Sequence, residues 1–391
     1  MRGAVSKATP PLVCRELILS GVFPLVVTMQ HINLEAEMKL KRRSLLTSAG
    51  TATVASLGFP AIVRAQPRIT WRMQSAWAKG VESQYHADLF AQKVTEQSDG
   101  RLTIKSLTAG SVVGGLDVFD AVNEGVIDAS HAISSFWIGK EPTAPMFAAV
   151  PLGMDALQYT MWYYQSDGLD LWAEMYKKYN FGFVGACGLN TAEDFLWSHK
   201  PITSLSDFNG LKIRTVGYWG EIATNLGARV VTLPGGEIYG ALERKILDAA
   251  EFANPAADYV SGFHQVCKYV HVPGIHQPTT ISELIINKSA WEKLTPDLQR
   301  LVKEAAKTTT LESWGHCVIE DAKALKKFEE YGTKIIRLSP EFISSFKDIA
   351  NKFYEKRRAN DAFFNKVYSS QAAIRKSYQT WAKYMVPPVE F

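Results

Sequence analysis

The sequence lacks the local signatures of the common enzyme classes. Its 391 residues contain no G-x-S-x-G elbow, Walker loop, H-E-x-x-H helix or paired C-x-x-C motif. His271 and His276 are five residues apart in an expected loop, which is not the i, i+4 spacing of two metal ligands on a helix. Acids are numerous, but no spacing pairs two of them for acid–base chemistry. These absences favour a binding protein over an enzyme.

Cysteine and net charge are also scarce. Three of the four cysteines, Cys187, Cys267 and Cys317, lie beyond residue 65, and their wide spacing indicates neither a disulfide framework nor a metal cluster. The net charge of +4 comes from the first 65 residues, which carry eight Lys/Arg and three acids and leave 35 basic against 36 acidic residues in the remainder. A nearly neutral body excludes an electrostatic case for nucleic-acid binding.

Long apolar runs are absent as well, and the front of the chain has the layout of a targeting segment. From Met38 a basic region with Arg42 and Arg43 precedes an apolar, small-residue stretch at 45–59 and a small-ended cleavage site at Ala65. The segment resembles a twin-arginine export signal, and its Thr, Ser and Gly residues make it too polar for a membrane anchor of about 20 apolar residues. We therefore expect residues 38–65 to direct export to a periplasm and residues 1–37 to be a non-native upstream extension.

The full chain is 47% hydrophobic, enough for a large core in two or three domains, and the elements beyond residue 65 alternate. The first part reads as strands at 69–75, 101–107 and 126–134 around helices at 81–98 and 116–123. The middle has strands at 180–188, 211–215, 228–233 and 246–252, with helices at 219–226 and 236–244. A long helix from 295 to 330, a strand at 333–339 and helices at 340–357 and 362–384 follow. This rhythm predicts an α/β fold.

Two segments echo each other. "DAVNEGVIDAS" (120–130) and "GALERKILDAA" (240–250) share the order helix, turn, apolar residue, Asp, small residue. The match predicts the same supersecondary unit once in each lobe, although chance similarity over eleven residues is an alternative.

Several motifs together resemble a known family. With "GLKIRT" (210–215), "GGEIYGALERKILDAAE" (235–251) and "INKSAWEKLTPDLQ" (286–299), the chain resembles the solute-binding subunit of TRAP transporters, DctP type, over essentially 68–385. "GLNT" (188–191) and "GKEPT" (139–143) are most similar to the branch that binds 2-oxo acids such as pyruvate, and to related lactate binders.

The resemblance implies a two-lobe periplasmic binding protein fold (type II-like), with a long crossing helix and a helical C-terminal tail. It assigns 66–190 and about 280–320 to lobe 1, 191–279 to lobe 2, and 321–391 to a returning strand and C-terminal helices. The expected function is capture of a small monocarboxylate without catalysis, for delivery to a small and a large permease subunit. The helical tail permits a homodimer. An exported enzyme on a similar scaffold, or a receptor that feeds a sensor, are the alternatives.

The resemblance also implies ligand residues. Arg214 matches the family's carboxylate-binding arginine, whose planar fork can donate two parallel hydrogen bonds. Asn190 matches a cleft asparagine, with a turn residue as the alternative. A family glutamine falls at Glu193 or Asp194, because this chain is one residue shorter there. Trp77 and Phe136 follow strands, where open α/β sheets bind ligands, so they are expected to form an apolar wall unless they pack in the core.

In the 2-oxo acid branch a cation bridges ligand and protein. Glu251 matches one glutamate ligand, the carbonyl of Phe252 replaces that of a tryptophan, and Gln277 stands where a second glutamate is expected. An acid at Asp194 or Glu193 replaces the family's glutamine, and Gln277 replaces a glutamate. The number of negatively charged ligands is therefore unchanged. Oxygen ligands of this kind suit Na⁺ or Ca²⁺. Loss of the metal together with a different substrate is the alternative.

Overall fold

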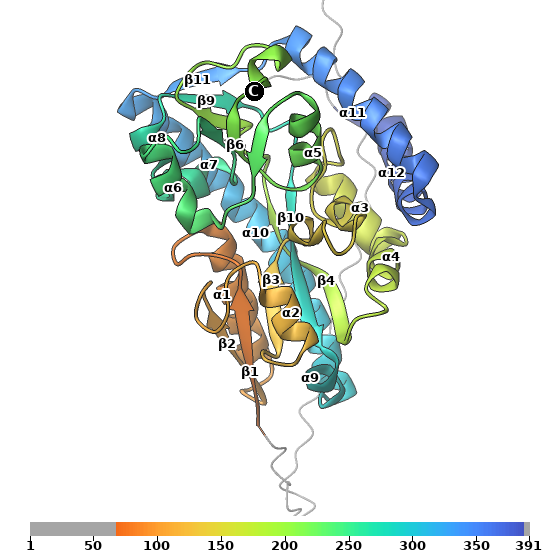
Figure 1. Cartoon of the computed structure of the whole chain (residues 1–391). Coiled ribbons are helices and arrows are strands. Elements are labelled where there is room, and N and C mark those ends of the chain that lie inside the picture. The colour runs from red at the N-terminus through yellow and green to blue at the C-terminus, as the bar shows by residue number, and fades with distance from the viewer. Residues whose placement is uncertain (1–67, 387–391) are drawn as a thin grey trace, which may run out of the picture. The chain divides into compact units, whose positions relative to one another are not determined.

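The computed structural model describes residues 68–386. These residues form two mixed β-sheets with helices packed around them (Figure 1). The expected upstream extension and export signal lie outside the described residues. Between residues 68 and 386, no helix has both the length and the apolarity needed to cross a membrane.

The first sheet has the order β2-β1-β3-β10-β4. Its strands are β1 (Ile69–Ser75), β2 (Leu102–Leu107), β3 (Ala129–Ala132), β4 (Phe181–Asn190) and β10 (Thr280–Asn287). Strand β1 is parallel to β2 and β3, whereas β10 runs antiparallel to β3 and β4. Helices α1 (Glu82–Gln97) and α2 (Val118–Asn123) make the expected crossovers. Strand β10 was not predicted.

The second sheet has the order β11-β9-β5-β8-β6-β7. Its strands are β5 (Leu196–Ser198), β6 (Lys212–Arg214), β7 (Arg229–Val231), β8 (Ala249–Ala250), β9 (Tyr269–Val272) and β11 (Lys334–Arg337), with helices α5 (Gly217–Asn225) and α6 (Gly235–Glu243). The strand expected at 246–252 pairs only through its two alanines. The sequence prediction missed β5 and β9. His271 lies in β9 and not in the expected loop.

The echo between the two segments is a structural repeat. In each copy a helix ends, the chain turns through a residue with positive φ (Gly125, +76°; Lys245, +55°), and a parallel strand follows. Asp128 Oδ2 accepts the Arg72 amide of β1 at 2.7 Å, and Asp248 Oδ2 accepts the Lys212 amide of β6 at 2.9 Å. The shared aspartate therefore joins β3 to β1 in the first sheet and β8 to β6 in the second.

A 36-residue helix, α10 (Pro296–Tyr331), runs along both sheets (Figure 1). Thr295 and Pro296 begin it, and Gly332 ends it in the left-handed conformation that glycine adopts without strain. The helix packs against α1, β4, β11 and α7 (Pro255–Val260). Thr310 and Ser313 accept the amides of Gly188 and Leu189 at 3.2 and 2.9 Å, so α10 is fixed to the end of β4.

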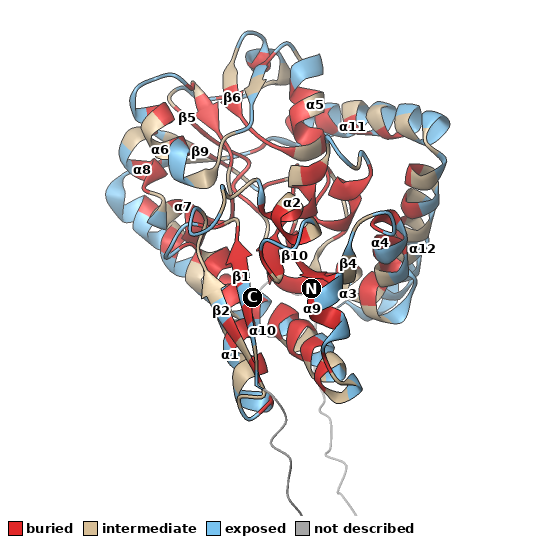
Figure 2. Cartoon of the chain, turned by 60° about the horizontal axis from the view of Figure 1, so that its bottom comes forward, coloured by how far each residue is buried: buried red, intermediate tan, exposed pale blue. Residues whose placement is uncertain are grey.

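The remaining helices cover the sheets and form the C-terminal tail. They are α3 (Ala156–Gln165), α4 (Gly168–Met175), α8 (Phe263–Val266), α9 (Lys288–Glu292), α11 (Pro340–Asn360) and α12 (Ala362–Met385). Helix α11 packs on α5, and α12 packs on α3 and α4. Buried residues are concentrated in the strands and on the inner faces of the helices (Figure 2). The two expected tail helices are present at nearly the expected positions.

Candidate functional site

A small cavity brings together most of the predicted ligand residues. It is lined by Trp77, Ser83, Ile133, Phe136, Asn190, Glu193, Arg214, Val216, Phe252, Ala253 and Thr280. Asn190 ends β4 in the first sheet and Arg214 ends β6 in the second, so both sheets contribute side chains. The cavity volume is about 10 Å³, which is room for roughly one water-sized sphere.

Arg214 is the basic group of this cavity and is only 1% exposed. Its Nη1 donates to the Glu251 carbonyl at 2.7 Å and lies 3.4 Å from Glu251 Oε1, while Nε donates to the Leu233 carbonyl at 3.2 Å. Within residues 68–386, Nη2 makes no hydrogen bond to the protein. The Phe252 ring lies 5.6 Å from the guanidinium carbon. A guanidinium held on one side with a donor left over can bind a carboxylate.

Glu251 lies directly behind Arg214 and is fully buried. Its Oε1 accepts the Val216 amide at 3.1 Å, whereas its Oε2 has no hydrogen-bond partner among the described residues. Burial alone would raise the pKa of Glu251, but Arg214 and His276 together hold it at about 2. The buried side chain is therefore an anion with one unpaired oxygen.

His276 lies between two carboxylates. Its Nε2 is 3.4 Å from Glu193 Oε2 and 3.9 Å from Glu251 Oε2. Glu193 also accepts hydrogen bonds from Thr280 Oγ1 at 2.8 Å and from Gln277 Nε2 at 2.7 Å. Burial raises the pKa of Glu193 to about 7. Burial would lower the pKa of His276, but the two carboxylates raise it to about 9, which favours the imidazolium.

The donor atoms of Glu193, Glu251 and His276 lie within 4.8 Å of one another. The unpaired Oε2 of Glu251 is the kind of buried oxygen that a cation satisfies. Hard cations such as Na⁺ and Ca²⁺ prefer carboxylate and carbonyl oxygens. The residues present therefore fit a hard cation, with the imidazolium as a second source of positive charge at the same place.

The structure separates the adjacent alternatives Glu193 and Asp194. Glu193 lines the cavity, whereas Asp194 is fully buried outside it and its amide donates to the Ala253 carbonyl at 3.0 Å. Burial raises the pKa of Asp194 to about 8. The amide of Gln277 is directed at Glu193 and does not line the cavity.

Sequence reasoning missed His276, which contacts the cavity residue Glu193, and some of the residues that line the cavity. His276 was considered only as a partner of His271, whose Nε2 instead accepts the Ile202 amide at 3.0 Å in the second sheet. Ser83 and Thr280 also line the cavity, and Ser83 accepts from the Asn190 side-chain amide at 3.2 Å. The only sequence signal for His276 was its position next to Gln277. Ser83 and Thr280 gave no signal, because serine and threonine are common at helix starts and in strands.

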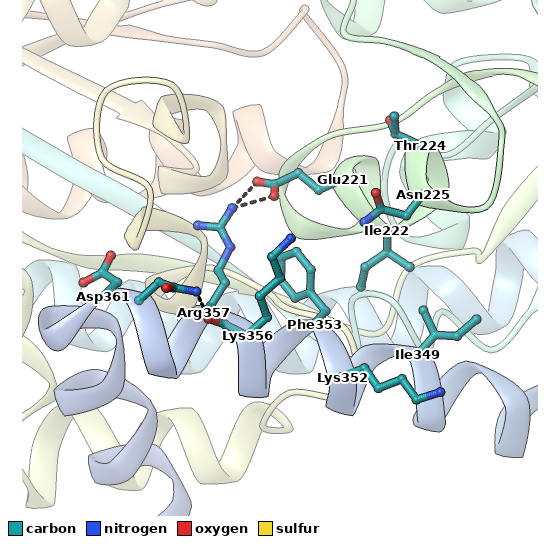
Figure 3. A pocket seen from close by; sticks show the side chains of 11 residues that line it. Glu221, Ile222, Thr224, Asn225, Ile349, Lys352, Phe353, Lys356, Arg357 and Asp361 are labelled. Atoms are coloured by element: carbon teal, nitrogen blue, oxygen red, sulfur yellow. Dashed lines mark hydrogen bonds and ion pairs between the residues drawn. The ribbon is translucent and has the colours of Figure 1, made fainter.

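A larger groove of about 660 Å³ lies between α5 and α11 (Figure 3). Arg357 of α11 crosses it to form an ion pair with Glu221 of α5, with Nη2 2.6 Å from Oε2. None of the residues predicted to bind ligand lines this groove. The small cavity is the better candidate, because it concentrates the buried charges.

Comparisons with known proteins give the family. Residues 74–361 match the model of the bacterial extracellular solute-binding protein family 7, DctP. A monocarboxylate 2-oxoacid-binding periplasmic protein of Nostoc is 32% identical over 349 residues, which cover 88% of this chain and 96% of that protein.

Solved structures of TRAP solute-binding proteins are similar to this chain. One from Pseudoalteromonas atlantica with bound sodium and pyruvate has a TM-score of 0.77 at 29% identity, covering 81% of this chain and 97% of its own. One from Bordetella bronchiseptica, a dimer with calcium and picolinate in one site, has a TM-score of 0.79 at 27% identity, covering 82% and 95%. These matches confirm the expected fold class. The chain belongs to the DctP family of TRAP transporter solute-binding receptors.

Proposed function

We propose that this chain is an extracytoplasmic receptor for a small 2-oxo or 2-hydroxy monocarboxylate, such as pyruvate or lactate. After export through its twin-arginine-like signal, it delivers the acid to the small and large membrane subunits of a TRAP permease. The observation that carries this proposal is the buried Arg214 fork in a cavity shared by both sheets. The 2-oxoacid-binding relative and the pyruvate-bound neighbours support the ligand class.

Arg214 binds the carboxylate of the ligand. A lone buried carboxylate is very unfavourable, so its capture needs a paired cation, and Arg214 retains the Nη2 donor for this purpose. Asn190 can donate to a 2-oxo oxygen, and can either donate to or accept from a 2-hydroxyl group. Trp77 and Phe136 lie together with 5.9 Å between ring centroids and cover a short acyl chain.

A cation bound with the acid would balance the charge. Glu193, Glu251 and the ligand carboxylate supply up to three negative charges, against Arg214 and an imidazolium at His276. Glu193, Glu251 and the Phe252 carbonyl would hold a Na⁺ or Ca²⁺, which supplies positive charge to the ligand oxygens when bound. A calcium- and pyruvate-bound neighbour from Colwellia psychrerythraea, 26% identical with a TM-score of 0.77, supports this assignment.

Ligand capture requires movement of the two sheets. The cavity volume of about 10 Å³ is smaller than any organic acid needs, so the acid enters when the sheets separate. Because Asn190 and Arg214 come from different sheets, a bound acid that contacts both stabilises the closed form. Ligand binding therefore shifts the population from the open to the closed form, and no covalent step is needed.

Calorimetry with pyruvate and lactate, with and without Ca²⁺, tests the proposal. Arg214→Ala should weaken binding about 100-fold or more, because truncating one partner of a buried charge pair costs about 2–5 kcal/mol. Arg214→Lys should bind with intermediate affinity, since lysine keeps the charge without the fork. Arg229→Ala, at an exposed arginine of the neighbouring strand β7, is the matched control. Arg214→Ala binding within threefold of the wild type would refute the assignment.

A further inference from the structure

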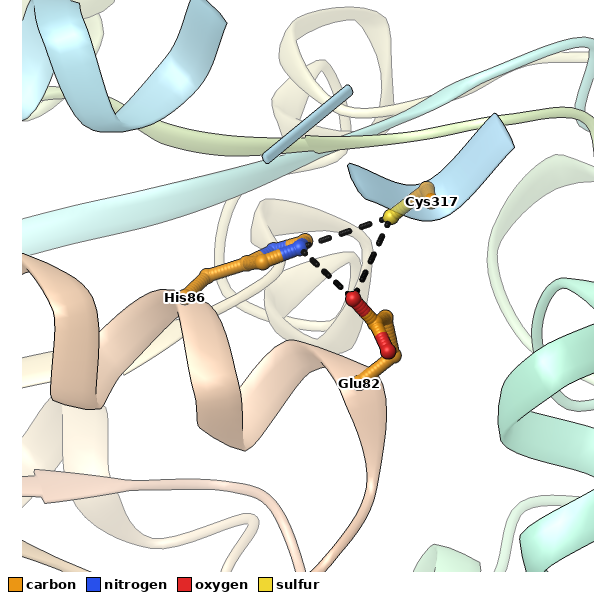
Figure 4. Close-up of side chains that lie close together, drawn as sticks. All are labelled: Glu82, His86 and Cys317. Atoms are coloured by element: carbon orange, nitrogen blue, oxygen red, sulfur yellow. Dashed lines mark hydrogen bonds and ion pairs between the residues drawn. The ribbon is translucent and has the colours of Figure 1, made fainter. Parts of the chain in front are cut away.

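A second cluster of potential metal ligands lies between α1 and α10 (Figure 4). Glu82 and His86 are one helical turn apart on α1, and Cys317 faces them from α10. The three side chains converge, as Figure 4 shows, although Cys317 is more than 200 residues away in the sequence. This cluster shares no residue with the group formed by Glu193, Glu251 and His276.

The distances within the cluster match a zinc-sized ion. Cys317 Sγ lies 3.5 Å from His86 Nε2 and 3.7 Å from Glu82 Oε1, and these last two atoms are 3.9 Å apart. The point equidistant from the corners of this nearly equilateral triangle lies about 2.1 Å from each atom. Zinc–nitrogen and zinc–oxygen bonds are about 2.0–2.2 Å long, and zinc–sulfur bonds about 2.3 Å.

The chemical environment suits a metal of intermediate softness. His86 and Cys317 are fully buried, and the side chain of Glu82 is 11% exposed. A set of one sulfur, one nitrogen and one oxygen is typical of zinc and its neighbours in the first transition series, not of Na⁺ or Ca²⁺.

An entry path lies beside the cluster, at His316. His316 Nε2 is 3.2 Å from the same Glu82 Oε1, and its ring stacks on Tyr85 with 4.4 Å between centroids. The His316 side chain is 37% exposed, so it connects the buried triangle to solvent. Tetrahedral zinc takes four ligands, and a water molecule that enters beside His316 can complete the set.

We propose that Glu82, His86 and Cys317 form a transition-metal site of the zinc type, separate from the cation site of the ligand cavity. Binding replaces the thiol proton by a sulfur–metal bond: Cys317–SH and M²⁺ give Cys317–S–M⁺ and a proton released to solvent. The site joins α1 of the first sheet to the long helix α10.

The site adjoins the ligand cavity through Asn190. The Cys317 thiol donates to Asn190 Oδ1 at 3.5 Å, and Asn190 lines the cavity. Loss of the thiol proton to a metal removes this donor. Asn190 Oδ1 then loses this hydrogen bond, and this contact couples the two sites physically.

Cobalt absorption on the chelator-treated full chain tests the proposal. One equivalent of Co²⁺ should produce a thiolate-to-cobalt charge-transfer band together with the visible bands of tetrahedral cobalt. The band should be absent in Cys317→Ser and should persist in Cys14→Ser and Cys267→Ser. Millimolar Ca²⁺ should not remove it. Cobalt bound at Glu193, Glu251 and His276 would give no thiolate band, so the two sites are distinguished.

Competition with a chromophoric chelator measures the Zn²⁺ affinity. Both Cys317→Ser and His86→Gln should weaken Zn²⁺ binding about 100-fold or more, since changes even to outer-shell partners cost about 10–100-fold. Circular dichroism checks that each variant is folded. A wild-type chain that binds Co²⁺ without a thiolate band, or that binds Zn²⁺ no more tightly than Cys317→Ser, would overturn the proposal. The wild-type spectrum decides the matter even if a variant fails to fold.

Discussion

A buried acid in the first sheet should make the free energy of unfolding depend on pH. Glu283 lies in the middle of β10 and is 1% exposed. Its Oε1 accepts the Trp137 indole N–H at 2.8 Å, and its Oε2 accepts the Trp172 indole N–H at 3.0 Å. Burial raises the pKa of Glu283 to about 7, against a reference of 4.5, despite these donors.

The sign of the effect follows from the direction of this change. A group that binds its proton more tightly in the folded state stabilises the fold below the unfolded pKa, and this contribution is lost as pH rises through the folded pKa. The difference between 4.5 and about 7 corresponds to about 3 kcal/mol. Most of it, about 2.5 kcal/mol, is lost between about pH 5 and pH 8.

Urea unfolding of the wild type and Glu283→Gln at pH 5, 6, 7 and 8 measures the loss. Glutamine cannot ionise, so the free energy of unfolding of the wild type should fall about 2.5 kcal/mol further than that of the variant across this range. Glu292→Gln, at an exposed position of α9, should follow the wild type. Other buried acids titrate in all three proteins and cancel in the differences. Parallel curves for the wild type and Glu283→Gln would refute the reasoning.

Two further changes test the contacts around the ligand cavity. Asp321 Oδ1 accepts the Asn254 side-chain amide at 2.7 Å and the Ala256 amide at 2.9 Å, so Asp321→Ala should lower the free energy of unfolding by about 2–4 kcal/mol. The neighbouring Glu320→Ala, at a partly exposed position, is the control. Equal urea midpoints for these two variants would contradict this expectation. His276→Gln removes a positive charge that faces two carboxylates and should tighten Ca²⁺ binding about tenfold in calorimetry. Weaker Ca²⁺ binding would show instead that the imidazole is a ligand.

The helices and the outer parallel strands were predictable because their signals are local. Thr295 followed by Pro296 marks the start of α10, and the alternation of "RLTIKSL" marks β2. Strand β10 was missed because all eight of its residues are buried, so "TISELIIN" lacks the polar face of a surface strand, and Glu283 interrupts its apolar run. Strands β5 and β9 have only three and four residues, too few to establish a period.

Residues of the site were predictable from the sequence only where they lie within a recognisable motif. Arg214 lies within "GLKIRT", and the family resemblance supplied its role. The choice between Glu193 and Asp194 depends on which of two adjacent side chains faces the cavity, and a one-residue change in segment length reverses that choice. The triangle of Glu82, His86 and Cys317 depends on how α10 packs on α1, and no spacing in the sequence expresses this packing.

The repeat explains why the two sheets supply different chemistry to one cavity. The echo aligns His131, which follows Ser130 in β3, with Glu251, which follows β8. His131 accepts the Trp77 indole N–H at 2.9 Å and donates through its other ring nitrogen to the Cys187 carbonyl at 2.8 Å. Glu251 holds Arg214 through its carbonyl and carboxylate.

Equivalent positions of the repeat therefore orient a residue that each sheet contributes to the cavity lining. In the first sheet that residue is the apolar wall Trp77, and burial lowers the pKa of its support His131 to about 4, so the support is neutral. In the second sheet it is the cation Arg214, and its support Glu251 is an anion. The neutral His131 ring accepts the hydrogen bond of the uncharged Trp77 indole, whereas the anionic Glu251 pairs with the charged Arg214 guanidinium. Divergence at this repeated position therefore accompanies an apolar side of the cavity at Trp77 and a cationic side at Arg214.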